Sequence, residues 1–193
     1  MTVIEEESPL SEPAELVPAN LAIGSRLLTA LTIFAFMGPA FAFFYLRSLN
    51  SAHMWRSARV DPPQAYGAAI MALLVASALA LALAARTAWW RVLVAGSLAL
   101  GVAAVLVQCV EYSQLDFGPM SGGYASVFLG WTALTAVFVL ATMLWLETLL
   151  AYGLRHSDAP SSVVRPRLDA LAFYWEFLTG LAVLMWAVLY LVA

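Results

Sequence analysis

The sequence has very few charged residues and contains no lysine. Of its 193 residues, 11% are charged and 63% are hydrophobic, with a mean hydropathy of +0.87. An ordinary soluble domain has roughly a quarter of its residues charged. This deficit excludes a soluble globular fold, a disordered chain and a protein that binds nucleic acid. The net charge of -3 describes the N-terminal tail, because five of the twelve acidic residues fall within the first 15 positions.

Cysteine and histidine are also scarce. The single cysteine, Cys109, cannot form an internal disulfide, and the two histidines, His53 and His156, lie outside the apolar runs. Haem ligation inside a bundle needs histidine or methionine at membrane depth, and no serine or cysteine within the runs has a histidine nearby. We therefore expect no catalytic, cofactor-binding or metal-binding residue in this chain.

What the sequence has in abundance is long apolar runs. A membrane-spanning helix needs about 20 mostly apolar residues, because backbone polar groups cannot be left unpaired in lipid. The sequence meets this requirement five times and predicts an all-α integral membrane bundle of five transmembrane helices over residues 25–193. The predicted spans are about 26–48, 64–86, 91–111, 123–149 and 168–192. Residues 1–24 are predicted to form an acidic, partly disordered cytoplasmic tail.

The distribution of arginine predicts the orientation, because basic residues in short loops are retained on the cytoplasmic side. One face has six of them, namely Arg26, Arg86, Arg91, Arg155, Arg165 and Arg167. The other face has three, Arg47, Arg56 and Arg59. This asymmetry predicts a multi-pass protein of the bacterial inner (plasma) membrane, with a cytoplasmic N-terminus and a C-terminus on the exported side.

Three carboxylates touch the predicted membrane. Glu111 and Glu147 lie near helix ends, where we expect them to be solvated. Glu176 lies about 10 Å deeper than Asp169 if the segment is helical. A carboxylate at that depth is costly and usually faces a protein interior and a partner. Either a functional or lipid-contacting role or a structural hydrogen bond fits Glu176 at this stage.

Small residues recur at every fourth position of the second and third spans. They are Ala68, Ala72, Ala76, Ala80 and Ala84, followed by Ala95, Ala99 and Ala103. Such stripes allow helices to approach closely. We expect packing within the chain, and a docking face for another subunit is the alternative.

Four short motifs, in order along the chain, resemble those of subunit III of the haem-copper cytochrome c oxidases. They resemble the family's FYLRS, Q-x-x-E-Y, Y-G-S-x-F and Y-W-H-F-V-D. The motifs here are Phe43-Phe44-Tyr45-Leu46-Arg47-Ser48, Gln108-Cys109-Val110-Glu111-Tyr112, Tyr124-Ala125-Ser126-Val127-Phe128 and Tyr174-Trp175-Glu176-Phe177. The match runs from about Leu27 to the C-terminus and corresponds to a divergent, short five-helix form without the family's first two helices.

Several polar positions of the family are changed in this chain. Its membrane carboxylate falls on Thr32, two of its histidines fall on Thr135 and Phe138, and its last motif has Glu176 for histidine and Thr179 for aspartate. The resemblance is therefore carried over only to a few residues. The candidate residues for lipid contact or support of proton uptake are Glu111, Tyr112, Arg47, Tyr174 and Trp175, together with Glu176 from its depth.

The resemblance implies an accessory subunit without redox centres. Members of this family pack beside subunit I, bind phospholipid between their helices and help to sustain proton uptake and the stability of the catalytic subunit. It implies subunits I and II and membrane lipids as partners, with haem and copper in the partner subunits and a bound phospholipid here. The chain is then a non-catalytic part of an oxidoreductase of aerobic electron transport. The alternatives are the subunit III-like protein that accompanies nitric-oxide reductases and a stand-alone small membrane transporter or scaffold.

Overall fold

The computed structural model describes residues 16–49, 55, 60–156 and 161–192. Every regular element within these ranges is a helix, which confirms the prediction of an all-α fold. The helices are α1 (Val17–Ser48), α2 (Gln64–Ala84), α3 (Trp90–Ser113), α4 (Gly123–Arg155) and α5 (Ser161–Ala187), and α5 continues into the π-helix η1 (Val188–Val192). Five spans, the last of which joins α5 and η1, are long and apolar enough to cross a membrane.

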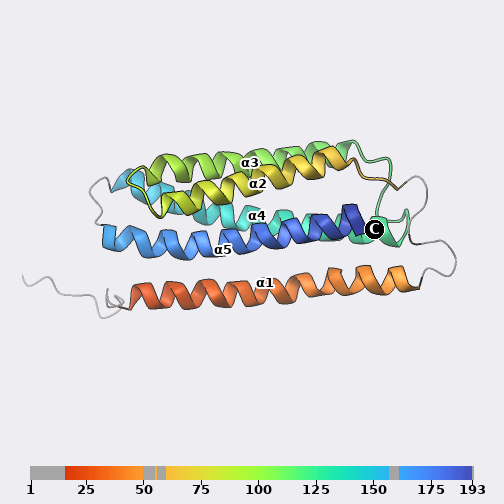
Figure 1. Cartoon of the computed structure of the whole chain (residues 1–193), viewed down its shortest axis with the longest axis horizontal. Coiled ribbons are helices and arrows are strands. Elements are labelled where there is room, and N and C mark those ends of the chain that lie inside the picture. Colours follow the sequence, from red (N-terminus) through yellow and green to blue (C-terminus); the bar gives the residue numbers. More distant parts are fainter. Residues whose placement is uncertain (1–15, 50–54, 56–59, 157–160, 193) are drawn as a thin grey trace, which may run out of the picture.

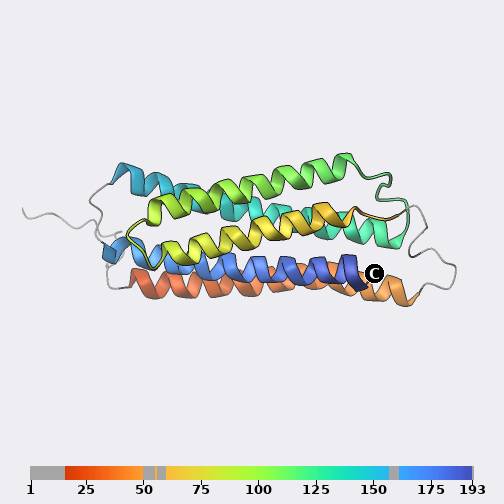
Figure 2. The ribbon, with the colours of Figure 1, turned by 45° about the horizontal axis from the view of Figure 1, so that its top comes forward.

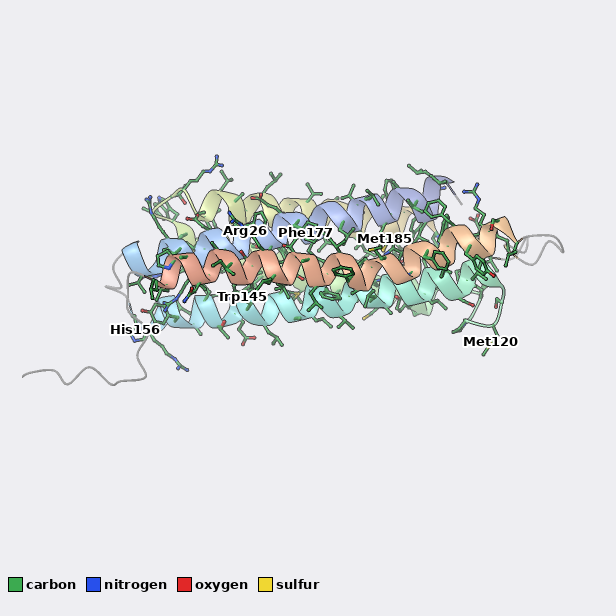
Figure 3. All side chains as sticks on the ribbon, turned by 90° about the horizontal axis from the view of Figure 1, so that it is seen from below. Arg26, Met120, Trp145, His156, Phe177 and Met185 are labelled. Carbon is green, nitrogen blue, oxygen red and sulfur yellow. The ribbon has the colours of Figure 1, made fainter. Side chains whose placement is uncertain are left out.

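The helices lie side by side, and each runs antiparallel to the one before it (Figure 1). Two of them, α2 and α3, form the most extensive pair, and α5 packs against α1, α2 and α4. Helix α1 lies along the outside of α4 and α5 at the edge of the bundle (Figures 2 and 3). The first and last described residues therefore lie at opposite ends of the molecule.

Three helices are longer than the predicted spans. Helix α1 begins at Val17 rather than near residue 26, so part of the predicted tail is helical, and α4 and α5 extend to Arg155 and back to Ser161. The 33 residues of α4 reach about 50 Å at 1.5 Å per residue, beyond the hydrocarbon core of about 30 Å. Apolar runs predict only the part of a helix in lipid, and its polar ends continue past that part. Residues 1–15, with the acidic tail, and His53, Arg56 and Arg59 lie outside the described residues.

A hydrogen-bonded link joins α2, α3 and α5 in the middle of the larger core. The Ser77 hydroxyl donates to the Ser97 carbonyl at 2.7 Å and contacts the Ser97 hydroxyl at 2.9 Å. The indole N–H of Trp175 donates to Ser77 Oγ at 3.0 Å. In lipid, helix association depends on close packing and interhelical hydrogen bonds rather than on the hydrophobic effect. This link therefore fixes the relative depth of the three helices.

The small-residue stripes do not serve the intrachain packing expected of them along most of their length. Ala68, Ala72 and Ala76 of α2 are exposed, as are Ala95 and Ala99 of α3. The contact between α2 and α3 is made by other positions, among them the serine pair. The expectation of packing within the chain is therefore wrong for these five positions, and a docking face for another subunit stays a prediction.

A second core closes the opposite end of the bundle. Trp55 lies in the connection between α1 and α2, and its ring packs edge to face on Phe43 and Tyr124, with centroids 5.1 Å and 5.8 Å away. The backbone N–H of Tyr124 donates to the Trp55 carbonyl at 2.8 Å. Aromatic pairs of this geometry contribute about 0.5–1.5 kcal/mol each beyond the area that they bury. They hold the start of α4 against the end of α1.

Candidate functional site

A buried carboxyl group lies near the end of α3. Glu111 is 1% exposed, and its Oε1 accepts a hydrogen bond of 2.5 Å from the Tyr190 hydroxyl of η1. Within the described residues, no basic side chain forms an ion pair with it. The expectation that Glu111 is a solvated helix-end residue is wrong. Helix α3 continues to Ser113, so Glu111 lies within its last turns and faces the bundle.

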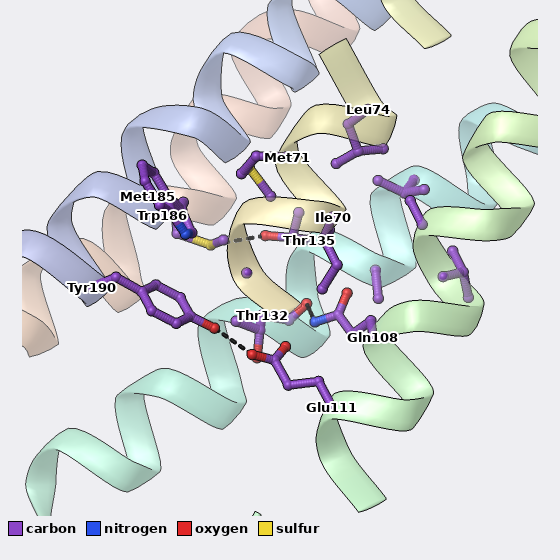
Figure 4. Close-up of a pocket in the computed structure, with 15 residues that line it drawn as sticks. Ile70, Met71, Leu74, Gln108, Glu111, Thr132, Thr135, Met185, Trp186 and Tyr190 are labelled. Atoms are coloured by element: carbon purple, nitrogen blue, oxygen red, sulfur yellow. Dashed lines mark hydrogen bonds between the residues drawn. The ribbon is translucent and has the colours of Figure 1, made fainter. Parts of the chain in front are cut away.

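A chain of polar side chains adjoins this pair (Figure 4). Gln108 lies one turn before Glu111, and its amide N–H donates to the Tyr112 hydroxyl at 3.3 Å and to the Thr132 carbonyl at 3.4 Å. Tyr112 also bonds Thr132 Oγ1 at 2.6 Å. Because the Thr132 hydroxyl already donates to the Phe128 carbonyl at 2.7 Å, Tyr112 is the donor. The bonds that Gln108 and Tyr112 donate to Thr132 tie α3 to α4.

A narrow cavity lies between α2, α3, α4 and α5, beside the carboxyl group. About 20 Å³ of it admits the centre of a water molecule, and its walls are mostly apolar. Space of that size holds one water molecule. The polar groups that line it are Gln108, Glu111, Thr132, Thr135, Trp186 and Tyr190. Within the described part of the chain, the buried indole N–H of Trp186 has no hydrogen-bond partner.

The end of α5 is shaped to bring Tyr190 to Glu111. Residues Val188–Val192 form the π-helix η1, a rare and wider turn that is frequent at functional sites. The Tyr124 hydroxyl donates to the Leu189 carbonyl within this turn at 2.7 Å. The rings of Trp186 and Tyr190 stack with centroids 6.0 Å apart, and both lie against the backbone of Gly67 in α2. Tyr190 thereby joins the C-terminal turn to α2, α3 and α4.

This arrangement keeps one ionisable group inside the bundle with a single donor and space for one water molecule. A carboxyl group so placed can hold a proton and exchange it with water in the cavity. No group of three potential metal ligands gathers within residues 16–49, 55, 60–156 and 161–192. The cluster can hold a proton or a small polar molecule.

The remaining candidate residues lie elsewhere in the bundle. Tyr174 is buried and donates to Thr32 Oγ1 of α1 at 2.8 Å, since that hydroxyl itself donates to the Leu28 carbonyl. Trp175 is fully buried in the link to Ser77. Arg47 is exposed at the end of α1, with its guanidinium carbon 6.0 Å from the centre of the Phe43 ring. The six candidates do not converge on one site, since only Glu111 and Tyr112 belong to the cluster.

Glu176, for which a functional or lipid-contacting role and a structural hydrogen bond both remained open, does not face the interior of the described bundle. Its side chain is exposed on α5, while Tyr174 and Trp175 before it are buried. Two hydrogen-bonded residues that face the core fix the rotation of the helix, and this rotation turns Glu176 outward. A structural hydrogen bond to another described part of the chain is therefore not its role.

Sequence reasoning missed Tyr190, Trp186 and Thr132 as parts of the polar cluster. Tyr190 lies three residues from the end of a span, where an aromatic residue is typical of the membrane interface. A usable signal existed in the spacing of Gln108 and Glu111, because polar residues three positions apart in an apolar helix share one face. That pattern indicates a face turned toward protein rather than lipid.

The helices and the polar cluster enclosed among them define a multi-pass helical membrane protein. No protein-family model matches the chain, and no curated protein matches it at a significant level of sequence similarity. These two comparisons therefore neither support nor contradict the family that the four motifs resemble.

Replacing Tyr190 by phenylalanine tests whether its hydroxyl supports Glu111. The change removes the donor and leaves a buried carboxyl group without its partner, so the free energy of unfolding is expected to fall by about 1–2 kcal/mol. Unfolding in mixed micelles with increasing dodecyl sulfate measures it. Tyr45→Phe, on the exposed side of α1, is the control and should change little. A Tyr190→Phe variant as stable as the control would show that the Tyr190 hydroxyl does not stabilise the buried Glu111 carboxyl group.

Proposed function

We propose that this protein is an accessory, cofactor-free subunit of a respiratory haem-copper oxidase, of the subunit III kind, in the bacterial inner membrane. Its role is to support aerobic electron transport, proton uptake and the stability of the catalytic subunit. The proposed orientation, with a cytoplasmic N-terminus, follows from the distribution of arginine. The proposed partners are subunits I and II, which hold the haem and copper, and a phospholipid.

The observation that carries the proposal is the placement of the motif residues. Glu111, Tyr112, Tyr174 and Trp175, which the resemblance singles out, each form a hydrogen bond to another helix. Residues used in this way hold helices at fixed depth and rotation, which suits a subunit that stabilises a complex. A catalytic subunit would instead present reactive side chains around a substrate.

Affinity purification of the tagged full chain from its native membranes, in a mild detergent, tests the proposal. We expect a large haem-containing subunit to be recovered with it in near-equal amount, visible in the reduced-minus-oxidised absorption spectrum. Oxygen consumption by the purified complex supports the oxidase assignment. Nitric-oxide reduction without oxygen consumption would instead assign the chain to the complex of a nitric-oxide reductase. Recovery of the chain without any haem-containing subunit would refute the proposal.

A further inference from the structure

One side of α5 is exposed along its length, and near its start Asp169 and Phe173 border a hollow shared with α1. Five residues form this α5 outer face, and they repeat at intervals of four and three positions, as expected for one side of a helix. They are Asp169, Phe173, Glu176, Gly180 and Leu184, all of them exposed. A Cβ atom added at Gly180 would meet nothing within 4 Å, so the face is open to a neighbour.

Glu176 lies near the middle of the membrane on this face. The span runs from Val163 to Val192, which places Glu176 about 20 Å from its start and about 24 Å from its end at 1.5 Å per residue. A hydrocarbon core about 30 Å thick leaves the short glutamate side chain far from both lipid headgroup layers. Phe173 and Gly180, one turn away on either side, provide no charge to balance it.

A carboxylate in this position needs a donor, and none of the described residues supplies one. Ionisable residues within membrane spans are costly and almost always face a protein interior or a water-filled cavity. The interior of this bundle lies on the opposite side of α5, where Trp175 and Leu178 are buried. The group that receives Glu176 must therefore come from a second protein.

We propose that the α5 outer face docks against a transmembrane helix of the catalytic subunit, which places a cationic or hydrogen-bond-donating side chain against Glu176. This inference rests on the proposed function for the identity of the partner. A cationic or hydrogen-bond-donating side chain complements the Glu176 carboxylate at that depth, whereas a lipid tail offers it no donor. Gly180 lets the partner helix come close to the α5 backbone, as small residues do at helix contacts in membranes.

The surroundings of the face fit such an interface. Toward the start of α5 the same side continues to Asp169 and Arg165, which are exposed and charged. Apolar residues around a buried polar anchor, bordered by charged residues, are the usual arrangement of a protein contact surface.

The test compares variants of the tagged full chain recovered from native membranes, with the haem-containing subunit measured per mole of chain. Glu176→Leu and Gly180→Leu are expected to lower that ratio about tenfold or more, because one partner of a buried polar pair is lost or the close approach is blocked. Glu176→Gln is expected to retain most of the recovery, since its amide still accepts a hydrogen bond. Glu147→Leu, which removes an exposed carboxylate of α4, is the matched control and should leave the ratio unchanged.

Folding is followed separately, as the melting temperature of each purified chain in detergent. Neither Glu176 nor Gly180 contributes to the core, so both leucine variants should melt like the wild type. Undiminished recovery of the haem-containing subunit with both variants would overturn the docking face and leave the proposed function standing. If the wild type instead recovers a different membrane protein and Glu176→Leu loses it, the docking face is supported and the proposed function fails. Capture of lipid or of a second copy alone would overturn this inference.

Discussion

Replacing Trp175 by alanine is expected to lower the free energy of unfolding by about 3 kcal/mol, at the lower end of the range for a buried tryptophan. The side chain is fully buried, its N–H donates to Ser77, and its ring lies beside Gly101 of α3. Truncation would open a cavity between three helices and remove the link between them. The lower end of the range applies because lipid, unlike water, also solvates apolar groups in the unfolded chain. Unfolding by dodecyl sulfate in mixed micelles measures the change.

Two further variants separate packing from hydrogen bonding at Trp175. Trp175→Phe keeps most of the ring and loses the bond to Ser77, which is expected to cost about 1 kcal/mol. Trp89→Ala, at a side chain that is 75% exposed, is the control and should stay within about 0.5 kcal/mol of the wild type. If Trp175→Ala were no more destabilising than Trp89→Ala, the helices would not meet at Trp175.

Replacing Gly67 by alanine is expected to destabilise the protein by about 2–3 kcal/mol, since overpacking and the loss of a hydrogen bond act together. The added methyl group would lie 2.7 Å from Cζ of Tyr190 and 2.8 Å from Nε1 of Trp186. Both rings must move, and Tyr190 then loses its bond to Glu111. The same unfolding assay measures the stability. The infrared C=O stretching band of the Glu111 carboxyl group should also shift in Gly67→Ala. The band is assigned to Glu111 by its loss from the spectrum of Glu111→Gln.

The matched control for Gly67→Ala is Gly96→Ala in the adjacent helix. An added methyl group there meets nothing within 4 Å, and alanine favours a helix over glycine by about 1 kcal/mol. Gly96→Ala should therefore be neutral or slightly stabilising. Equal stability of the two variants, with the infrared band unmoved in both, would show that Tyr190 and Trp186 do not pack on Gly67.

The course of the chain through the membrane could be predicted from hydropathy, because lipid requires every spanning backbone to be helical. The apolar runs located all five helices, although α1 begins about nine residues earlier than predicted, at Val17. Helix ends beyond the lipid are set by polar residues and local contacts, such as Pro18 near the start of α1. A count of apolar residues along the sequence does not detect these contacts.

The candidate site was harder to predict, since hydropathy gives the depth of a residue and not the direction in which it points. Glu111, expected to be solvated near a helix end, is buried, whereas Glu176, for which the sequence left two roles open, is exposed deep in its span. The rotation of α5 is set by Tyr174 and Trp175, whose partners Thr32 and Ser77 lie on other helices. Pairings across so many positions cannot be derived from one sequence.

Helix α1 packs mainly against α4 and α5, and this has a consequence for the order of biosynthesis. Its bond from Thr32 to Tyr174 joins residues 142 positions apart. At about 5–20 residues per second, a ribosome needs roughly 7–28 s to make the intervening chain. During that time α1 resides in the bilayer on the strength of its own apolar length, with a hydropathy of 2.0. Helix α1 precedes the other described helices in synthesis and is thus among the last of them to be packed. A polar substitution on its lipid-facing side would act on insertion before it could act on the folded bundle.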